Sequence, residues 1–145
     1  MWRFLMGITL FILLISGCRS NNIDEDVNDE QNDNKSIIEV VSKHGHIQNL
    51  DALNTFVENV KNQLKSEINY VRYGIEGQRG VMTLTFNSEN INVFHEVDGN
   101  FIEEYKCKDV IVETNDDVKK YILIQCSGDF EGDFELLEVS TKQFN

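Results

Sequence analysis

Six short segments rich in β-branched and aromatic residues follow one another in the second half of the chain, and turn residues separate them. Such segments favour β-strands, and regular turns between them are typical of a sheet whose strands follow one another. Asp98 and Gly99 form the strongest turn signal, because Asp-Gly readily adopts the positive φ angles of a two-residue hairpin. The pattern predicts an antiparallel meander with strands at residues 68–75, 81–86, 91–97, 101–113, 118–127 and 134–140.

Two helices are expected before these strands. A short helix is predicted to begin at Ser36, which can cap it, and to end at the glycine of the His-Gly-His sequence at residues 44–46. A longer helix is predicted to begin near Asn49 or Asp51, because one apolar stripe follows there. The stripe consists of Leu50, Leu53, Phe56, Val57, Val60 and Leu64. We therefore expect an α+β fold, with one short and one long N-terminal helix packed on a meander of about five to six strands.

Residues 1–17 have the layout of a secretory signal. Arg3 supplies one positive charge, an almost unbroken apolar run follows at residues 4–15, and small residues precede Cys18. The run is too short for a membrane-spanning helix, which needs about 20 apolar residues. Its end resembles the lipobox of bacterial lipoproteins, in which a peptidase cleaves before a diacylglycerol-bearing cysteine. We predict cleavage between Gly17 and Cys18 and lipidation of Cys18; an ordinary secretory signal is the alternative.

The segment after the predicted signal is strongly acidic. Residues 18–35 hold six carboxylates, with Ile23 and Val27 as their only large apolar side chains. Such a stretch cannot bury enough apolar surface to offset its ordering entropy, so it is predicted to be a disordered tether. Residues 36–145 have a normal size for one domain with its own core. The predicted organisation is therefore a signal at 1–17, a lipidated tether at 18–35 and a single α+β domain at 36–145.

Acidic side chains outnumber basic ones, 25 to 13, and this imbalance limits the partners of the chain. Loss of residues 1–17 would remove one basic residue, Arg3, and leave 25 acidic and 12 basic side chains, a formal charge of −13. Nucleic acid needs a basic surface, and anionic lipid headgroups attract basic segments, so neither should bind the protein surface. We expect a monomer whose contact with the membrane is the lipid on Cys18, at the extracytoplasmic face of the cell membrane.

Cys107 and Cys126 lie on consecutive predicted strands. With a two-residue loop at Asp116 and Asp117, facing positions have numbers that sum to 233, so the two cysteines face each other. Directly opposed Cβ atoms lie about 4.5–5.5 Å apart, close enough for a disulfide with slight adjustment. Export to an oxidising compartment would permit the bond. A structural disulfide is predicted, and two buried free thiols are the alternative.

Several short motifs occur in an order that resembles a known family. They are Val40-Val41-x-x-His44-Gly45-x-Ile47-x-Asn49-Leu50, then Val71-x-Tyr73-x-x-Glu76-Gly77, and finally Cys107 with Cys126-x-Gly128. With the signal and the acidic tether, they resemble short lipoproteins of spore-forming, Bacillus-type Gram-positive bacteria that carry the domain of unknown function numbered 4362. The resemblance covers most of residues 36–139. It implies a lipid anchor and a single small domain, and it transfers no active residue.

Three histidines are the main candidates for site chemistry. His44 and His46 flank a glycine and could bind a metal if a carboxylate converged on them, whereas such loop histidines are more often exposed. His95 lies in a predicted strand. The alternating carboxylates at residues 129–135 could gather Ca²⁺, although a solvated strand face explains them better. No serine or cysteine has a visible activating partner, so no catalytic residue, metal site or cofactor is assigned.

Two classes of function stay open. The first is a non-enzymatic binding or interaction module, which would use Tyr70, Tyr73 and Phe94 if they are exposed; an inhibitor or immunity lipoprotein that captures a basic protein is one form of it. The second is a small extracytoplasmic enzyme with a site of histidine and carboxylate. An exposed apolar patch above about 400 Å² favours the first class. A concave pocket that collects a histidine and carboxylates with perturbed pKa values favours the second. The lack of a catalytic constellation favours the binding module.

Overall fold

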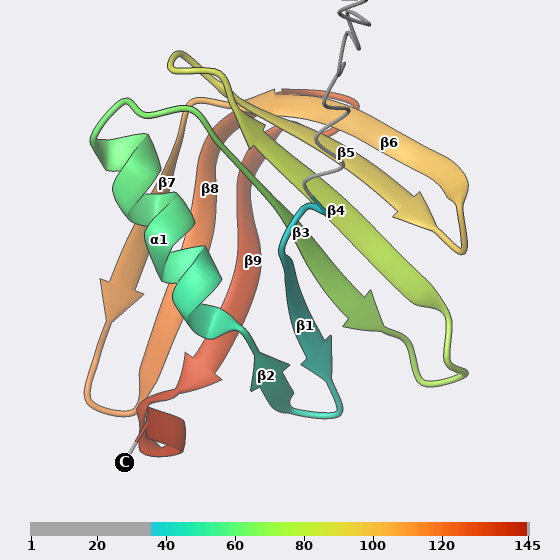
Figure 1. Ribbon diagram of the computed structural model, residues 1–145, viewed down its shortest axis with the longest axis vertical. Helices are drawn as coiled ribbons and strands as arrows, with labels where there is room; N and C mark the ends of the chain where they lie inside the picture. The colour runs from blue at the N-terminus through green and yellow to red at the C-terminus, as the bar shows by residue number, and fades with distance from the viewer. Residues whose placement is uncertain (1–35, 145) are drawn as a thin grey trace, which may run out of the picture. The chain divides into compact units, whose positions relative to one another are not determined.

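The computed structural model describes residues 36–144, which form nine strands, one α-helix and a short 3₁₀ helix (Figure 1). In chain order the elements are β1 (Glu39–Lys43), β2 (His46–Gln48), α1 (Leu50–Lys61), β3 (Ser66–Tyr73), β4 (Arg79–Phe86), β5 (Ile91–Val97), β6 (Asn100–Cys107), β7 (Asp109–Thr114), β8 (Val118–Gly128), β9 (Gly132–Ser140) and η1 (Thr141–Phe144).

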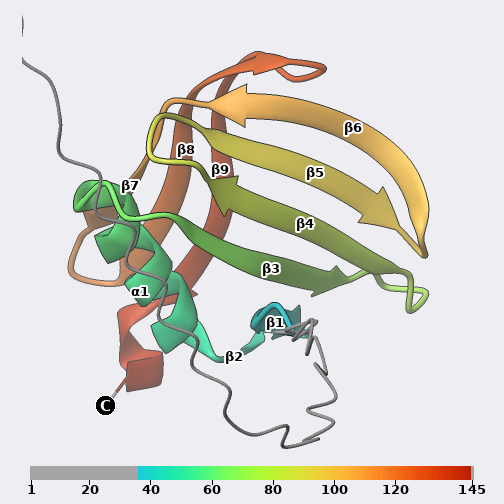
Figure 2. The same ribbon diagram turned by 45° about the horizontal axis from the view of Figure 1, so that its top comes forward.

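All nine strands belong to one sheet. Its order is β2-β1-β3-β4-β5-β6-β8-β7, and β9 pairs with β8 beside this path. Neighbouring strands are antiparallel except β1 and β3, which are parallel. The sheet curls strongly, and α1 lies inside the curl, between the β3 side and the β7 side (Figure 2). The inner surface is called the concave face below, and the outer surface the convex face.

The predicted fold class is wrong, because the domain is mostly β and has a single helix among its described residues. The short helix predicted from Ser36 is instead strand β1, and the chain turns through His44 and Gly45, with φ angles of 49° and 82°, into β2. β-Branched residues such as Val40 suit a strand. Besides β2, β1 pairs with β3, about 30 residues later, and no local pattern reveals that second pairing.

The sheet also holds more strands than predicted. The segment 101–113, expected as one strand, is divided into β6 and β7 at Lys108, whose N–H donates to the carbonyl oxygen of Ile124 at 3.0 Å. β8 pairs with both halves: its Gly128 faces Tyr105 of β6, and its Ile124 faces Asp109 of β7. The other predicted strands match β3, β4, β5, β8 and β9 within two residues. The two-residue hairpin at Asp98-Gly99 is confirmed, with φ angles of 50° and 78°.

The predicted long helix corresponds to α1. Asn49 precedes it in a left-handed conformation, and its side-chain amide donates to the carbonyl oxygen of Glu39 at 2.8 Å, which ties the start of the helix to β1. Three stripe residues are buried: Leu53, Phe56 and Val60. Leu64 lies beyond the end of the helix and is exposed. The buried stripe packs into the core with Ile68, Leu84, Phe86 and Ile91 from β3, β4 and β5.

Candidate functional site

Helix α1 covers only part of the concave face (Figure 2), and a cavity of about 190 Å³ is lined by residues of β3, β4 and β5. Two rows of paired residues across β3, β4 and β5 line it. One row is Tyr70, Met82 and His95, and the next is Arg72, Gly80 and Val97. Gly74 and Gln78, from the loop between β3 and β4, complete the lining. Strand register therefore builds this pocket from residues that are far apart in the sequence.

Three of the residues that line the pocket have ionisable side chains: Arg72, His95 and Tyr70. His95 directs its Nδ1 at the Glu103 carboxylate of the neighbouring strand β6, at 3.0 Å, and only 17% of its side chain is exposed. Among residues 36–144, no carboxylate lies within ion-pairing distance of Arg72. Arg79, one strand away, is instead paired with Glu39. The pocket lining therefore carries a cation without a partner carboxylate.

Tyr70 forms one wall of the pocket and is 4% exposed. Burial raises the pKa of its hydroxyl, against the opposing effects of a hydrogen bond with Ser42 and the positive charge of Arg72. The hydroxyl thus stays protonated at neutral pH. Tyr70 contributes a mainly apolar surface with one polar end.

Gly80 keeps the floor of the pocket open. A Cβ at this position would lie 3.5 Å from the carbonyl oxygen of Arg72, 3.8 Å from Nε2 of His95 and 3.9 Å from Cγ2 of Val97. These are ordinary contact distances, so the methyl group of an alanine would fit without displacing the backbone but would fill space between the two rows. Because Gly80 has no side chain, this part of the cavity stays empty.

The lining contains none of the residues that usually form acyl-transfer nucleophiles, because serine, threonine and cysteine are missing from its eight residues. The contact between His95 and Glu103 orients the imidazole, which can exchange a proton or make a polar contact through Nε2. Recognition of a small molecule needs only such fixed polar groups and an apolar surface. The geometry supports binding more directly than covalent chemistry.

The other predicted ligand candidates lie elsewhere. His44 and His46 belong to the exposed β1–β2 hairpin, and residues 36–144 contain no group of three metal-ligating side chains. Three of the four carboxylates of the 129–135 row contact the protein itself. Asp129 accepts the N–H of Glu104 at 2.9 Å, Asp133 accepts the N–H of Gln125 at 2.8 Å, and Glu135 contacts Lys120 at 2.8 Å.

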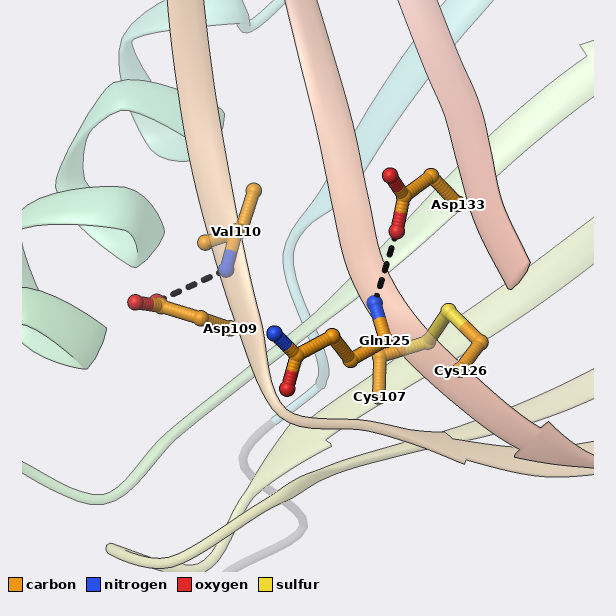
Figure 3. Close-up of a disulfide and its surroundings, with 6 residues drawn as sticks. All are labelled: Cys107, Asp109, Val110, Gln125, Cys126 and Asp133. Carbon is orange, nitrogen blue, oxygen red and sulfur yellow. Dashed lines mark hydrogen bonds between the residues drawn. A yellow bond between two sulfur atoms is a disulfide. The ribbon is translucent and has the colours of Figure 1, made fainter. Parts of the chain in front are cut away.

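Cys107 and Cys126 form a disulfide with an S–S distance of 2.08 Å (Figure 3). The residue numbers of facing positions sum to 233 in both the β6–β8 and the β7–β8 pairing, as the sequence predicts, so the register continues across the bend at Lys108. Both cysteines are buried. Asp133 holds the backbone of Gln125 next to the bridge (Figure 3). The position of the disulfide, at the bend between two strands, indicates a structural role.

The three aromatic residues considered for binding differ in exposure. Tyr70 is buried at the pocket wall, and Tyr73 is half-buried with the Lys43 ammonium 5.2 Å from its ring centre. Phe94 is 40% exposed and its ring contacts that of Phe101 in a tilted arrangement, with ring centroids 5.4 Å apart. Phe94 alternates with His95 along β5 and therefore lies on the convex face. An exposed apolar pair thus exists there, and Phe101 was missed as part of it.

Sequence reasoning also missed Arg72, Gln78, Gly80 and Met82 as lining residues. Gly80 falls just outside the predicted strand at residues 81–86, whereas it lies in β4 and faces Val97. The only signal that could have found the pocket is the alternation along β3, which puts Tyr70 and Arg72 on one face. Pairing those residues with β4 and β5 requires the register of three strands.

Cys18, Gly17 and the predicted tether lie outside the described residues. Within residues 36–144, no helix has the length and apolar character needed to cross a membrane.

A family model described as "Domain of unknown function (DUF4362)" matches residues 37–122, from the start of β1 into β8. This span covers more than half of the chain and includes every residue that lines the pocket. No curated protein and no solved structure matches the chain. The chain belongs to the DUF4362 family.

Proposed function

We propose that this DUF4362 protein is a non-enzymatic binding module that takes a small molecule into its concave pocket and is held at the outer face of the cell membrane by lipid on Cys18. The observation that carries the binding proposal is the pocket itself, an open cavity whose lining combines apolar groups with Arg72 and His95 and holds no acyl-transfer nucleophile.

The pocket is built for binding because its walls are fixed before a ligand arrives. Six of its eight lining residues are held by the paired strands β3, β4 and β5. A preformed site loses little conformational entropy when it binds, so even a small ligand can be retained. At roughly 30 Å³ for each water, 190 Å³ has room for about six waters, a volume that suits a small molecule.

An enzyme that uses His95 and Glu103 is the competing function. Their contact resembles the orientation of a general base by a carboxylate. A hydrolase of this kind could activate a water in place of a side-chain nucleophile, so the experiment must distinguish release of an unchanged ligand from its conversion. The exposed apolar pair Phe94 and Phe101 adds support for an interaction role, because such groups gather at binding surfaces.

The binding proposal is tested by equilibrating the purified full-length chain, in mild detergent, with a small-molecule extract of cells and examining it by native mass spectrometry. We expect an adduct whose released ligand has the same mass as the molecule in the extract. Gly80→Val should remove the adduct by filling the pocket floor, and Thr85→Val, on the convex face of the same strand, should retain it. An adduct that both variants retain, no adduct at all, or time-dependent conversion of the ligand would contradict the proposal.

The anchoring proposal rests on the sequence at residues 15–18. Two acyl chains, each contributing about 0.8 kcal/mol per buried CH₂, hold a protein on a membrane without any buried protein surface. We expect Cys18→Ala to release the chain from membranes or leave it unprocessed, and mass spectrometry of the wild type to find an acylated N-terminal Cys18. Unchanged membrane retention of a processed Cys18→Ala chain would contradict lipid anchoring.

A further inference from the structure

The charge of the pocket is opposite to that of the chain. The chain has 25 acidic and 13 basic residues, yet the lining contains no carboxylate and one arginine. Two carboxylates outside the lining contact lining residues: Glu103 is directed at His95 at 3.0 Å, and Glu76 accepts a hydrogen bond from the side-chain amide of Gln78 at 2.9 Å. The lining itself therefore carries a positive side chain, whereas the chain as a whole has a net negative charge.

Arg72 has the chemistry of an anion receptor. Its guanidinium presents donors in a planar fork that matches the two oxygens of a carboxylate. It lies at the end of β3, on the same face as Tyr70, and has no partner carboxylate among residues 36–144. The side-chain amide of Gln78, another lining residue, donates one N–H to the Glu76 carboxylate and has a second N–H for a further hydrogen bond.

The rest of the lining suits an apolar body. The Tyr70 ring, the Met82 thioether and the Val97 methyl groups lie in the two rows beside Arg72. An inorganic anion would leave these surfaces without a contact, whereas an organic acid would cover them as its charged end reaches the guanidinium.

We infer that the pocket binds small organic carboxylates, with the carboxylate on Arg72 and a short apolar body against Tyr70, Met82 and Val97. This inference rests on the proposed binding function and deepens it. A carboxylate of about the size of butyrate fits the cavity, and the charge requirement separates butyrate from its neutral isostere butyramide.

The test is a set of isothermal titrations of the full-length chain, in mild detergent, with butyrate, butyramide and inorganic phosphate. Butyrate should bind with at least about tenfold higher affinity than either other probe, because a charge-assisted hydrogen bond is stronger than a neutral one. Arg72→Gln should reduce butyrate affinity to the butyramide level. Gly80→Ala, which keeps the charge and narrows the floor, should weaken butyrate binding as well.

Arg79→Gln is the matched control, because Arg79 carries the same charge, faces Tyr73 in the next register position and does not line the pocket. It should leave butyrate binding unchanged. Equal losses in Arg72→Gln and Arg79→Gln would show non-specific attraction and overturn the inference, as would phosphate binding as tightly as butyrate. Equal binding of butyramide and butyrate would overturn carboxylate recognition while leaving small-molecule binding intact. No binding of any probe would overturn the inference, and the extract experiment would still decide whether the pocket binds a ligand.

Discussion

Tyr105 and Tyr121 are both buried, but only the hydroxyl of Tyr121 has a hydrogen-bond partner among the described residues. Replacement by phenylalanine should therefore change the free energy of unfolding in opposite directions at the two positions. Tyr105 is 2% exposed, and its hydroxyl has no hydrogen-bond partner among the described residues. Tyr121 is 0% exposed, and its hydroxyl donates to Oδ1 of Asn54 at 2.6 Å. Replacing each by phenylalanine removes only the hydroxyl, so neither substitution opens a large cavity.

An unpaired buried hydroxyl costs about 1–3 kcal/mol, and a typical hydrogen bond contributes about 0.5–1.5 kcal/mol. Tyr105→Phe should therefore raise the free energy of unfolding by about 1–3 kcal/mol. Tyr121→Phe should lower it by about 1 kcal/mol, because Asn54 keeps its contact with Lys119 at 2.9 Å. Urea unfolding at pH 7 measures both. A Tyr105→Phe variant as destabilised as Tyr121→Phe would refute the reasoning and show that the Tyr105 hydroxyl has a partner.

The same hydroxyl predicts a pH dependence. Burial, and next the negative charge of Glu103, raise the pKa of Tyr105 to about 12 from its ordinary value of 10.0. The contribution of the neutral phenol is therefore fully present below pH 10 and is lost as the pH rises through 12, because only the unfolded chain ionises in that interval. Wild type should lose stability between pH 10 and 12 more steeply than Tyr105→Phe. Parallel curves for the two proteins would contradict this assignment.

Further predictions concern the corner where β6 and β7 separate. Gly128→Ala should lower the free energy of unfolding by about 2 kcal/mol, because Gly128 has a φ of 130° and a Cβ there would lie 3.0 Å from the Cα of Tyr105. Gly80→Ala, at an ordinary φ, is the control, and urea unfolding should show no loss of stability for it. The double variant Cys107→Ala/Cys126→Ala should lose about 3 kcal/mol, given the separation of 19 residues. A reducing agent should destabilise the wild type and leave this double variant unchanged, and equal sensitivity of the two proteins would argue against the disulfide.

The strands could be predicted because their signals are local. Alternation of apolar residues and turn residues such as Asp98-Gly99 place β3, β4 and β5 almost at their observed limits. The hairpin register also follows from local loop length, which is why Cys107 and Cys126 could be paired. These features depend on residues within about twenty positions of one another.

The errors arise where distant contacts decide the structure. The segment of Val40 and Val41 is apolar enough for a short helix, but its parallel pairing with β3 makes it a strand. The division at Lys108 depends on β8, which holds both halves of the chain. The pocket has no motif of its own, because Arg72, Gly80 and Val97 meet only when three strands are in register.

The partial cover that α1 gives to the concave face has a kinetic consequence. A site that is open to solvent needs no hinge or lid, so a ligand can enter and leave without rearrangement of the sheet. Under the proposed binding function, occupancy would then follow the surrounding concentration, and the residence time would depend on the contacts alone. Such a receptor would sample its surroundings and would not store what it binds.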